Sequence, residues 1–207
     1  MRRILCYIGV CLGVFVVICS CKRTYFPKPY AYYRIAIPDT SYIPLDSLAK
    51  GERYPFTFLV SVNAEISHSQ NMEKYWFNIH YPGLNTDIHC SYKSIQNNLK
   101  ELNDDAVNFV YKHISHASAI PEREFSNSYA KVHGVLFSLM GNTASPYQFF
   151  LTDSTRHFFR GAVYCNCHPN QDSLLPVHQY IEKDVVRLVE SFQWKNRFQG
   201  YSVKSKG

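Results

Sequence analysis

The chain has 207 residues, of which 46% are hydrophobic, 15% aromatic and 18% charged, and this composition excludes an intrinsically disordered protein. Its 22 basic and 16 acidic side chains give a formal net charge of +6, but no basic cluster is dense enough to indicate nucleic-acid binding. The length allows one domain with a core of its own after an N-terminal signal is removed.

The first 20 residues have the pattern of an export signal. Two arginines precede an uncharged apolar run over residues 4–18, and Ser20 and Cys21 follow. A small residue directly before a cysteine is typical of a bacterial lipoprotein signal, in which the cut falls before the cysteine and the thiol carries the lipid. We therefore expect residues 1–20 to be a signal peptide and Cys21 to be lipidated. An uncleaved signal anchor is the alternative, because an uncharged run of about 18 residues reaches the lower limit of a spanning helix.

The chain after Cys21 begins with a short tether. Residues 21–31 contain two prolines, which favour an extended, semi-rigid segment. A single globular domain is expected over residues 32–196, followed by a polar tail over residues 197–207. In the first half of this domain, apolar and aromatic runs bounded by turn residues predict strands over residues 32–37, 55–62, 74–80 and 86–93.

A helix, three strands and a second helix are expected next. Apolar residues at steps of three and four predict an amphipathic helix of about 20 residues from Ile95 to Ile114, with Ser94 as its N-cap. Three runs joined by short turns predict an antiparallel meander over residues 131–140, 148–151 and 156–165. The closing helix should carry Pro176 in its first turn and end near Trp194.

The order strands, helix, strands, helix indicates the α+β class. We expect an antiparallel or mixed β-sheet packed with two main helices. This order is also similar to that of the Mog1/PsbP-like sandwich, in which a sheet lies between helices, but such a likeness implies no function.

Short motifs along the chain carry a resemblance to a known family. They include Trp76-Phe77-Asn78-Ile79 and Asp172-Ser173-Leu174, and the densest part comprises Gly141-Asn142-Thr143-Ala144-Ser145, Thr152-Asp153-Ser154 and Arg160-Gly161-Ala162. With these motifs in this order, the sequence resembles the GldD family, lipoproteins of the gliding-motility and type IX secretion apparatus of Bacteroidetes bacteria. The resemblance implies a non-enzymatic role in assembling or stabilising that apparatus, with its components as partners and with no cofactor.

The residues after Cys21 bear on localisation. Lys22-Arg23-Thr24 is basic, whereas the surface-export signal of Bacteroidetes lipoproteins is typically acidic at this place. This difference favours a domain that faces the periplasm over one displayed outside the cell. The expected anchor is a palmitate-bearing Cys21 in a membrane of the cell envelope, the outer membrane being the expected one.

Three further cysteines remain after Cys21, at positions 90, 165 and 167. In an oxidising compartment, Cys90 is a candidate for a disulfide with Cys165 or Cys167, and free packed thiols are the alternative. A metal site on Cys165, Cys167, His168 and His178 is disfavoured, because a one-residue gap is unlike the usual spacing of zinc thiolates. A metal pair on His113 and His116 is disfavoured too, since histidines suit a solvated helix C-terminus. No metal is expected.

No catalytic residue is predicted. Asp153, Ser154 and His157 have the residue types of a hydrolase triad, but no Gly-x-Ser-x-Gly elbow surrounds a serine, and a turn explains them better. His157 and Arg160 lie beside aromatic residues and are candidates for a protein-contact surface, with structural packing as the alternative. The run Tyr75-Trp76-Phe77 is a candidate for an aromatic ligand cleft, although core packing is the more natural interpretation.

Overall fold

The computed structural model describes residues 35–49, 51–68 and 73–195. The predicted signal peptide, Cys21, the tether, the start of the first predicted strand and the polar tail lie outside these residues. In chain order the elements are β1 (Tyr42–Pro44), α2 (Leu45–Leu48), β2 (Phe56–Thr57), β3 (Leu59–Ser61), β4 (Glu65–Ser67), β5 (Phe77–Tyr81), η1 (Pro82–Leu84), β6 (Thr86–Ser94), α3 (Leu99–Tyr111), η2 (Ile114–His116), β7 (Ala117–Ala119), β8 (Glu122–Asn127), β9 (Val132–Ser138), β10 (Met140–Gly141), β11 (Tyr147–Thr152), β12 (His157–Cys165), α4 (Gln171–Ser191) and β13 (Gln193–Trp194).

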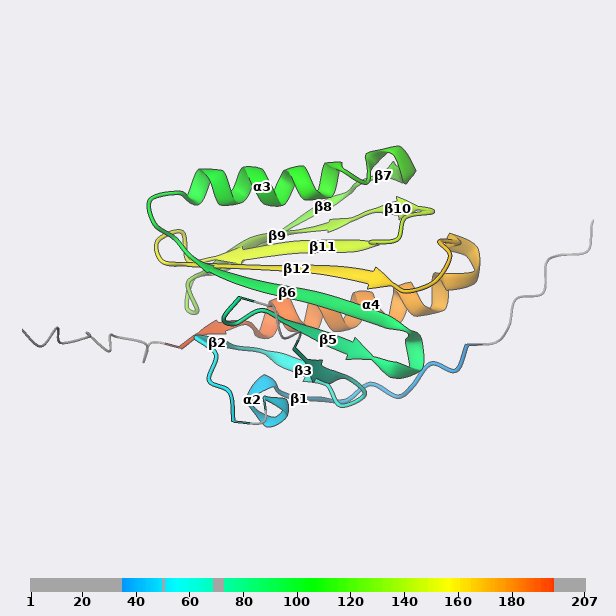
Figure 1. The fold of residues 1–207 in the computed structure, drawn as a ribbon, viewed down its shortest axis with the longest axis horizontal. Helices are drawn as coiled ribbons and strands as arrows, with labels where there is room; N and C mark the ends of the chain where they lie inside the picture. Colours follow the sequence, from blue (N-terminus) through cyan, green and yellow to red (C-terminus); the bar gives the residue numbers. More distant parts are fainter. Residues whose placement is uncertain (1–34, 50, 69–72, 196–207) are drawn as a thin grey trace, which may run out of the picture. The chain divides into compact units, whose positions relative to one another are not determined.

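A seven-stranded antiparallel sheet forms the centre of the described domain. Its strand order is β4-β5-β6-β12-β11-β9-β8 (Figure 1). Strands β9, β11 and β12 are consecutive neighbours, so the predicted meander is confirmed. Three two-stranded pairs, β1-β3, β7-β10 and β2-β13, complete the strand pairing of the described residues. With two main helices beside the sheet, the predicted α+β class is confirmed.

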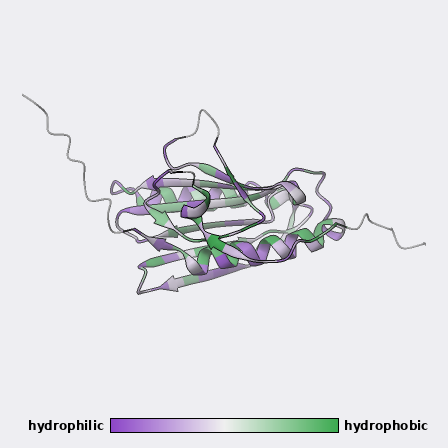
Figure 2. Cartoon of the chain, turned by 90° about the horizontal axis from the view of Figure 1, so that it is seen from below, coloured by the Kyte–Doolittle hydropathy of each residue, from purple (hydrophilic) through white to green (hydrophobic). Residues whose placement is uncertain are grey.

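The two faces of the sheet follow from the alternation of side chains along each strand. In β6, Ile88, Cys90 and Tyr92 are buried, whereas the residues between them are more accessible. Figure 2 shows the resulting change between apolar and polar positions along strands and helices. Each face therefore receives its own set of side chains and its own helix.

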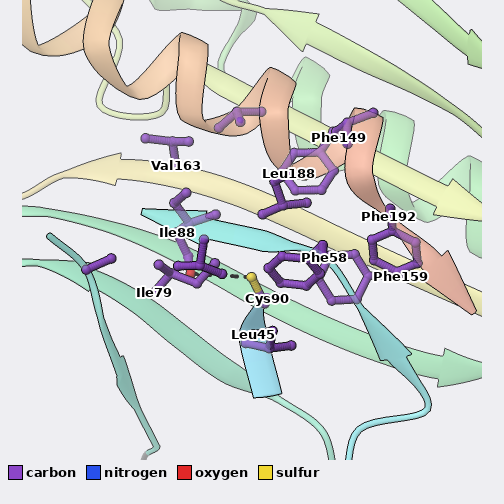
Figure 3. Packing of buried hydrophobic residues seen from close by; sticks show 14 of the residues in the cluster. Leu45, Phe58, Ile79, Ile88, Cys90, Phe149, Phe159, Val163, Leu188 and Phe192 are labelled. Carbon is purple, nitrogen blue, oxygen red and sulfur yellow. Dashed lines mark hydrogen bonds between the residues drawn. The ribbon is translucent and has the colours of Figure 1, made fainter. Parts of the chain in front are cut away.

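Helix α4 and the short strands β1 to β3 cover one face and enclose the larger core. Aromatic rings fill it, and Phe159 in β12 lies with its centroid 4.8 Å from that of Phe56 and 5.1 Å from that of Phe192 (Figure 3). Both neighbours come from the distant β2 and the end of α4. This face is closed by segments from both ends of the domain.

Helix α3 covers part of the opposite face. Its buried residues Leu102, Ala106 and Val110 pack with apolar side chains of β9, β11 and β12 in a second, smaller cluster. Strands β5 and β6 contribute no side chain to that cluster. The helix thus leaves the β5-β6 side of this face less covered.

Several element boundaries differ from the prediction. Residues 35–41 are not a strand, and the first strand begins at Tyr42. The run 55–62 is divided at Phe58, because β2 pairs with β13 and β3 pairs with β1. β8 was not predicted as a separate strand, since most of its residues are exposed and show no alternation.

The two helices also begin elsewhere than predicted. Ser94 ends β6, and the N–H of Ile95 donates to the carbonyl of Arg156 at 2.9 Å, so the chain is still bound to the sheet there. Asn97 then adopts a left-handed φ of 61°, and α3 begins at Leu99. Pro176 lies inside α4 rather than in its first turn, because the helix begins at Gln171. Among the described residues, no helix is long and apolar enough to cross a membrane.

Candidate ligand-binding cleft

A cleft of about 430 Å³ opens on the α3 face of the sheet, where the helix leaves β5 and β6 uncovered. Helix α3 forms one wall with Leu102, Asp105, Ala106 and Phe109. The sheet contributes Asn78, His89, Cys90, Ser91, Lys93, Phe158 and Arg160, and Trp76, the residue before β5, also lines the cleft. The cleft therefore combines an apolar helix wall with a polar sheet surface, which is the usual character of a small-ligand site.

Arg160 is the central polar group of this cleft. Its Nη2 donates to Oε1 of the buried Gln148 at 2.8 Å, and its guanidinium carbon lies 4.6 Å from the ring centroid of Phe109. Burial lowers the pKa of Arg160, and a hydrogen bond with Tyr164 opposes this change. An arginine nevertheless stays protonated in a protein, so the cleft holds a positive charge. No ion pair links Arg160 to a carboxylate of the described residues.

Two histidines near Arg160 are biased towards the neutral form. For His89, loss of solvent lowers the pKa, Asp87 raises it and Arg160 lowers it further, with a net decrease. For His113, loss of solvent, His116 and Arg160 all lower the pKa. Near neutral pH the positive charge at the cleft therefore belongs to Arg160 and Lys93, while Asp105 is the acidic residue among the described lining side chains.

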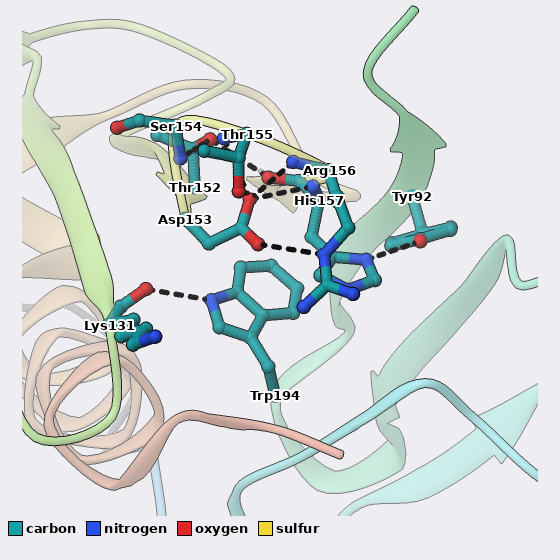
Figure 4. A network of polar contacts seen from close by, with 9 residues as sticks. All are labelled: Tyr92, Lys131, Thr152, Asp153, Ser154, Thr155, Arg156, His157 and Trp194. Carbon is teal, nitrogen blue, oxygen red and sulfur yellow. Dashed lines mark hydrogen bonds and ion pairs between the residues drawn. The ribbon is translucent and has the colours of Figure 1, made fainter. Parts of the chain in front are cut away.

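His157 lies on the other face of β12 and does not share a surface with Arg160. Its Nδ1 is 2.7 Å from the hydroxyl oxygen of Tyr92, and its ring stacks on Trp194 with centroids 5.0 Å apart (Figure 4). Burial lowers the pKa of His157, Asp153 raises it and Arg156 lowers it, with a net decrease. The two residues predicted as one contact surface thus belong to two separate sites.

Asp153 organises the turn beside His157. Its Oδ1 accepts backbone N–H hydrogen bonds from Thr155 at 3.0 Å, Arg156 at 2.7 Å and His157 at 2.8 Å (Figure 4). Ser154 is exposed with a left-handed φ of 63°. The carboxylate is thereby occupied by the turn, as the sequence indicated, and the three residues do not form a nucleophile relay.

A second hollow of about 400 Å³ lies at this turn, lined in part by Lys131, Asp153, Arg156, His157 and Trp194. Several of its polar groups are engaged within the protein. The Trp194 indole donates to the Lys131 carbonyl at 3.1 Å, and Arg156 Nε lies 3.9 Å from Asp153 Oδ2. We therefore take the Arg160 cleft, whose cation has no carboxylate partner in the described chain, as the candidate site.

The three described cysteines are free thiols. Cys165 pairs in register with Thr86, which is four residues from Cys90 along β6. At about 3.3 Å per residue, the two cysteines are roughly 13 Å apart, whereas a disulfide needs Cα atoms within about 7 Å. Cys167 lies beyond the end of β12 and is exposed. The structure therefore supports the free-thiol alternative over a disulfide from Cys90.

The residues weighed for metal binding are dispersed. Cys165 is buried, Cys167 and His168 are exposed, and His178 packs with its ring edge-on to Tyr147. Within residues 35–49, 51–68 and 73–195, no group of three or more histidine, cysteine or acidic side chains is arranged to hold a metal ion.

The sequence pointed to parts of the cleft without assembling them. Phe77 is fully buried, but its neighbour Trp76 lines the cleft and donates its indole N–H to the Tyr92 carbonyl at 3.2 Å. Phe109 is one of the apolar residues of the predicted helix over residues 95–114, yet 43% of it is exposed. Lys93, Asn78 and Gln148 were missed. The alternating polar positions of residues 86–93 were the available signal for this face.

Comparison with protein families identifies the chain. The model for the family described as gliding motility lipoprotein GldD matches residues 22–194, which includes nearly all of the described domain. A comparison with curated proteins gives no significant match. On the extent of the family match, the chain belongs to the GldD family of gliding motility lipoproteins.

Proposed function

We propose that this protein is a non-enzymatic envelope lipoprotein that supports the assembly or stability of the gliding and type IX secretion machinery. The family match carries this proposal, because it begins at residue 22, directly after the cysteine of the lipoprotein signal, and extends through the folded domain. Cys21 holds the protein at the outer membrane, the domain faces the periplasm, and its partners are components of that machinery.

The chemistry of the cleft supports a binding role. Arg160, Lys93 and Asn78 are groups that recognise and orient a ligand, and they face an apolar wall on α3. At the second hollow, the Asp153 carboxylate already accepts hydrogen bonds from three backbone N–H groups of its own turn, and is therefore engaged within the protein. The alternative is a periplasmic ligand- or metal-binding lipoprotein. A ligand-binding role would use the same cleft, and the two roles are compatible if the ligand belongs to a partner protein.

The test is deletion of the gene, followed by complementation with the wild type or a Cys21→Ala variant. We expect deletion to abolish secretion of type IX cargo, and gliding where the strain glides, and to lower the abundance of other components of the machinery. Normal secretion and normal component levels in the deletion strain would contradict the proposal.

The anchor is tested separately with radioactive palmitate. Labelling should occur in the wild type and be absent in Cys21→Ala. Labelling that persists in the variant would rule out Cys21 as the lipidated residue. A Cys167→Ala variant is the matched control, because Cys167 is an exposed thiol that lies outside the signal.

A further inference from the structure

We infer that the cleft beside α3 binds a carboxylate that is attached to an apolar group, with Arg160 as its charge partner. This inference rests on the proposed function and gives the chemistry by which a partner would be recognised. The carboxylate has two natural sources, the C-terminus of a polypeptide that ends in an apolar residue and a free small organic acid.

The first step of the argument is the state of Arg160. Removing a cation from water is costly unless a counter-charge and hydrogen bonds replace the solvent. The guanidinium has five N–H donors, of which one on Nη2 is directed to Gln148 Oε1 at 2.8 Å and a further one is used by the hydrogen bond with Tyr164, so others remain for a ligand. None of the described carboxylates forms an ion pair with it. A planar guanidinium with free donors is matched by the two oxygens of a carboxylate.

The second step is the apolar wall. Leu102, Ala106, Phe109 and Phe158 line the cleft beside Arg160, and the Phe109 ring covers the guanidinium at 4.6 Å. Phe109 is also one of the large apolar side chains that remain exposed. A ligand that places an apolar group against this wall would bury it and, at the same time, exclude water from the ion pair, which strengthens the attraction.

The third step concerns the charge of the ligand. Arg160 and Lys93 face a single acidic residue, Asp105, in the described lining, and this balance suits a singly charged anion better than a multiply charged one such as phosphate. Asn78, also in the lining, has a buried Oδ1 with no hydrogen-bond partner, and such an acceptor calls for a donor. The amide N–H of a peptide supplies that donor. A single carboxylate on an apolar, amide-bearing group satisfies these features together.

The experiment is calorimetric titration of the full-length lipoprotein, reconstituted in nanodiscs of zwitterionic phosphatidylcholine. The probes are acetyl-Leu-Phe with a free carboxylate, the same dipeptide as its C-terminal amide, 3-phenylpropionate and inorganic phosphate. We expect the free acid to bind at least about tenfold more tightly than the amide, because a hydrogen-bonded charge is lost in the amide. Tighter binding of acetyl-Leu-Phe than of 3-phenylpropionate assigns the site to a polypeptide terminus, and the reverse order assigns it to a small acid.

Three variants test the charges of the cleft: one should weaken binding, one should tighten it and one should leave it unchanged. Arg160→Gln should weaken binding of the free acid by at least about tenfold and leave the amide unchanged. Asp105→Asn should tighten binding by roughly twofold, since it removes a repulsive charge at the rim. Arg123→Gln is the matched control for net charge, because Arg123 lies in the edge strand β8 with 57% of its side chain exposed and should bind as the wild type does.

Arg160→Lys keeps the charge and serves if Arg160→Gln does not fold, and it should bind the free acid more weakly than the wild type because the planar fork is lost. Equal binding of acid and amide, binding unchanged in Arg160→Gln or Arg160→Lys, full displacement of the dipeptide by equimolar phosphate, or no binding of either acid at millimolar concentration would each overturn the inference. Such a result leaves the secretion phenotype of the deletion strain unaffected, so the failure of this inference is distinguishable from failure of the proposed function.

Discussion

Phe158 and Phe159 are adjacent in β12, yet they enter different environments because alternate residues of a strand face opposite sides of the sheet. Phe159 is fully buried among rings contributed by β2, β5, β11, the end of α4 and Phe58, which lies between β2 and β3. Phe158 stacks on Phe150 at 5.5 Å and also lines the cleft. The difference teaches that one face of the sheet is closed by packed aromatic rings, whereas the other face keeps an accessible cleft beside α3.

Replacing Phe158 or Phe159 by alanine should give the largest difference in stability between the two faces. Phe159→Ala should lower the free energy of unfolding by about 3–5 kcal/mol, since the cavity that it leaves is enclosed. Phe158→Ala should cost less, about 2–3 kcal/mol, because Phe158 is 4% exposed but borders the cleft, so that water can fill part of the space it leaves. Urea unfolding of both variants measures the gap, and equal losses would contradict the contrast between the faces.

A glycine on the closed face should have the next largest effect. Gly161 is in register with Phe149 of β11, and a Cβ at Gly161 would lie 2.2 Å from the Phe149 ring. Gly161→Ala should therefore lower the free energy of unfolding by about 1–3 kcal/mol through overpacking. Gly83→Ala is the control, since nothing lies within 4 Å of a Cβ there. Equal melting temperatures of the two variants would show that the face is less closed than described.

The Asp153 carboxylate makes the stability of the fold depend on pH. Burial raises the pKa of this carboxyl, but the backbone N–H groups of Arg156, His157 and Thr155 lower it, and the net pKa is below its ordinary value. The carboxylate therefore stabilises the fold above the pKa of the unfolded chain, about 4, and this contribution is lost as the pH falls through the lower folded pKa.

Asp153→Ala should consequently cost about 1–3 kcal/mol at pH 7 and much less at the acid end of the profile. Unfolding by urea between pH 7 and pH 2 measures the difference. Asp104→Ala is the control, because the Asp104 carboxylate is largely exposed in an i,i+4 pair with Lys100. A difference between wild type and Asp153→Ala that does not shrink with acid would disprove the role of the turn.

The smallest effect concerns the thiols. Burial raises the pKa of Cys90 and of Cys165, the latter to about 11, and both side chains are inaccessible in the fold. Cys167 is exposed, so iodoacetamide should modify it first in the native protein, and modification of Cys90 should await unfolding. Mass spectrometry of the alkylated protein gives this order. Equal rates at Cys90 and Cys167, or a disulfide under non-reducing conditions, would contradict it.

Periodicity predicted the central part of the fold well. The alternation in residues 86–93 gave β6, and the run 156–165 gave β12, because both strands are long and paired on each side. Alternate side chains of these strands lie on two faces with different surroundings, and this difference appears in the sequence as an alternation of apolar and polar residues. The same signal failed for β8, an edge strand whose residues are mostly exposed.

The cleft could not be assembled from the sequence, because its parts come from separate elements. Arg160 and Phe109 meet only after α3 folds over β12, and no spacing along the chain encodes that contact. Treating His157 and Arg160 as one surface was wrong, since an odd separation of three residues in a strand places them on opposite faces. That separation was visible in the sequence and would have prevented the error.

The pairing of β2 with β13 has a consequence for folding kinetics. Lys195 Nζ binds Asp46 at 2.6 Å across 149 residues of sequence, and the N–H of Leu59 donates to Ser191 Oγ at 2.8 Å across 132 residues. Such contacts raise the contact order, and closing long loops slows the search for the native state. The larger aromatic core includes residues of α4 and Phe192 at its end. A chain that lacks this helix therefore leaves the apolar face of the sheet uncovered, and the native fold can form only when the C-terminal part of the domain is present.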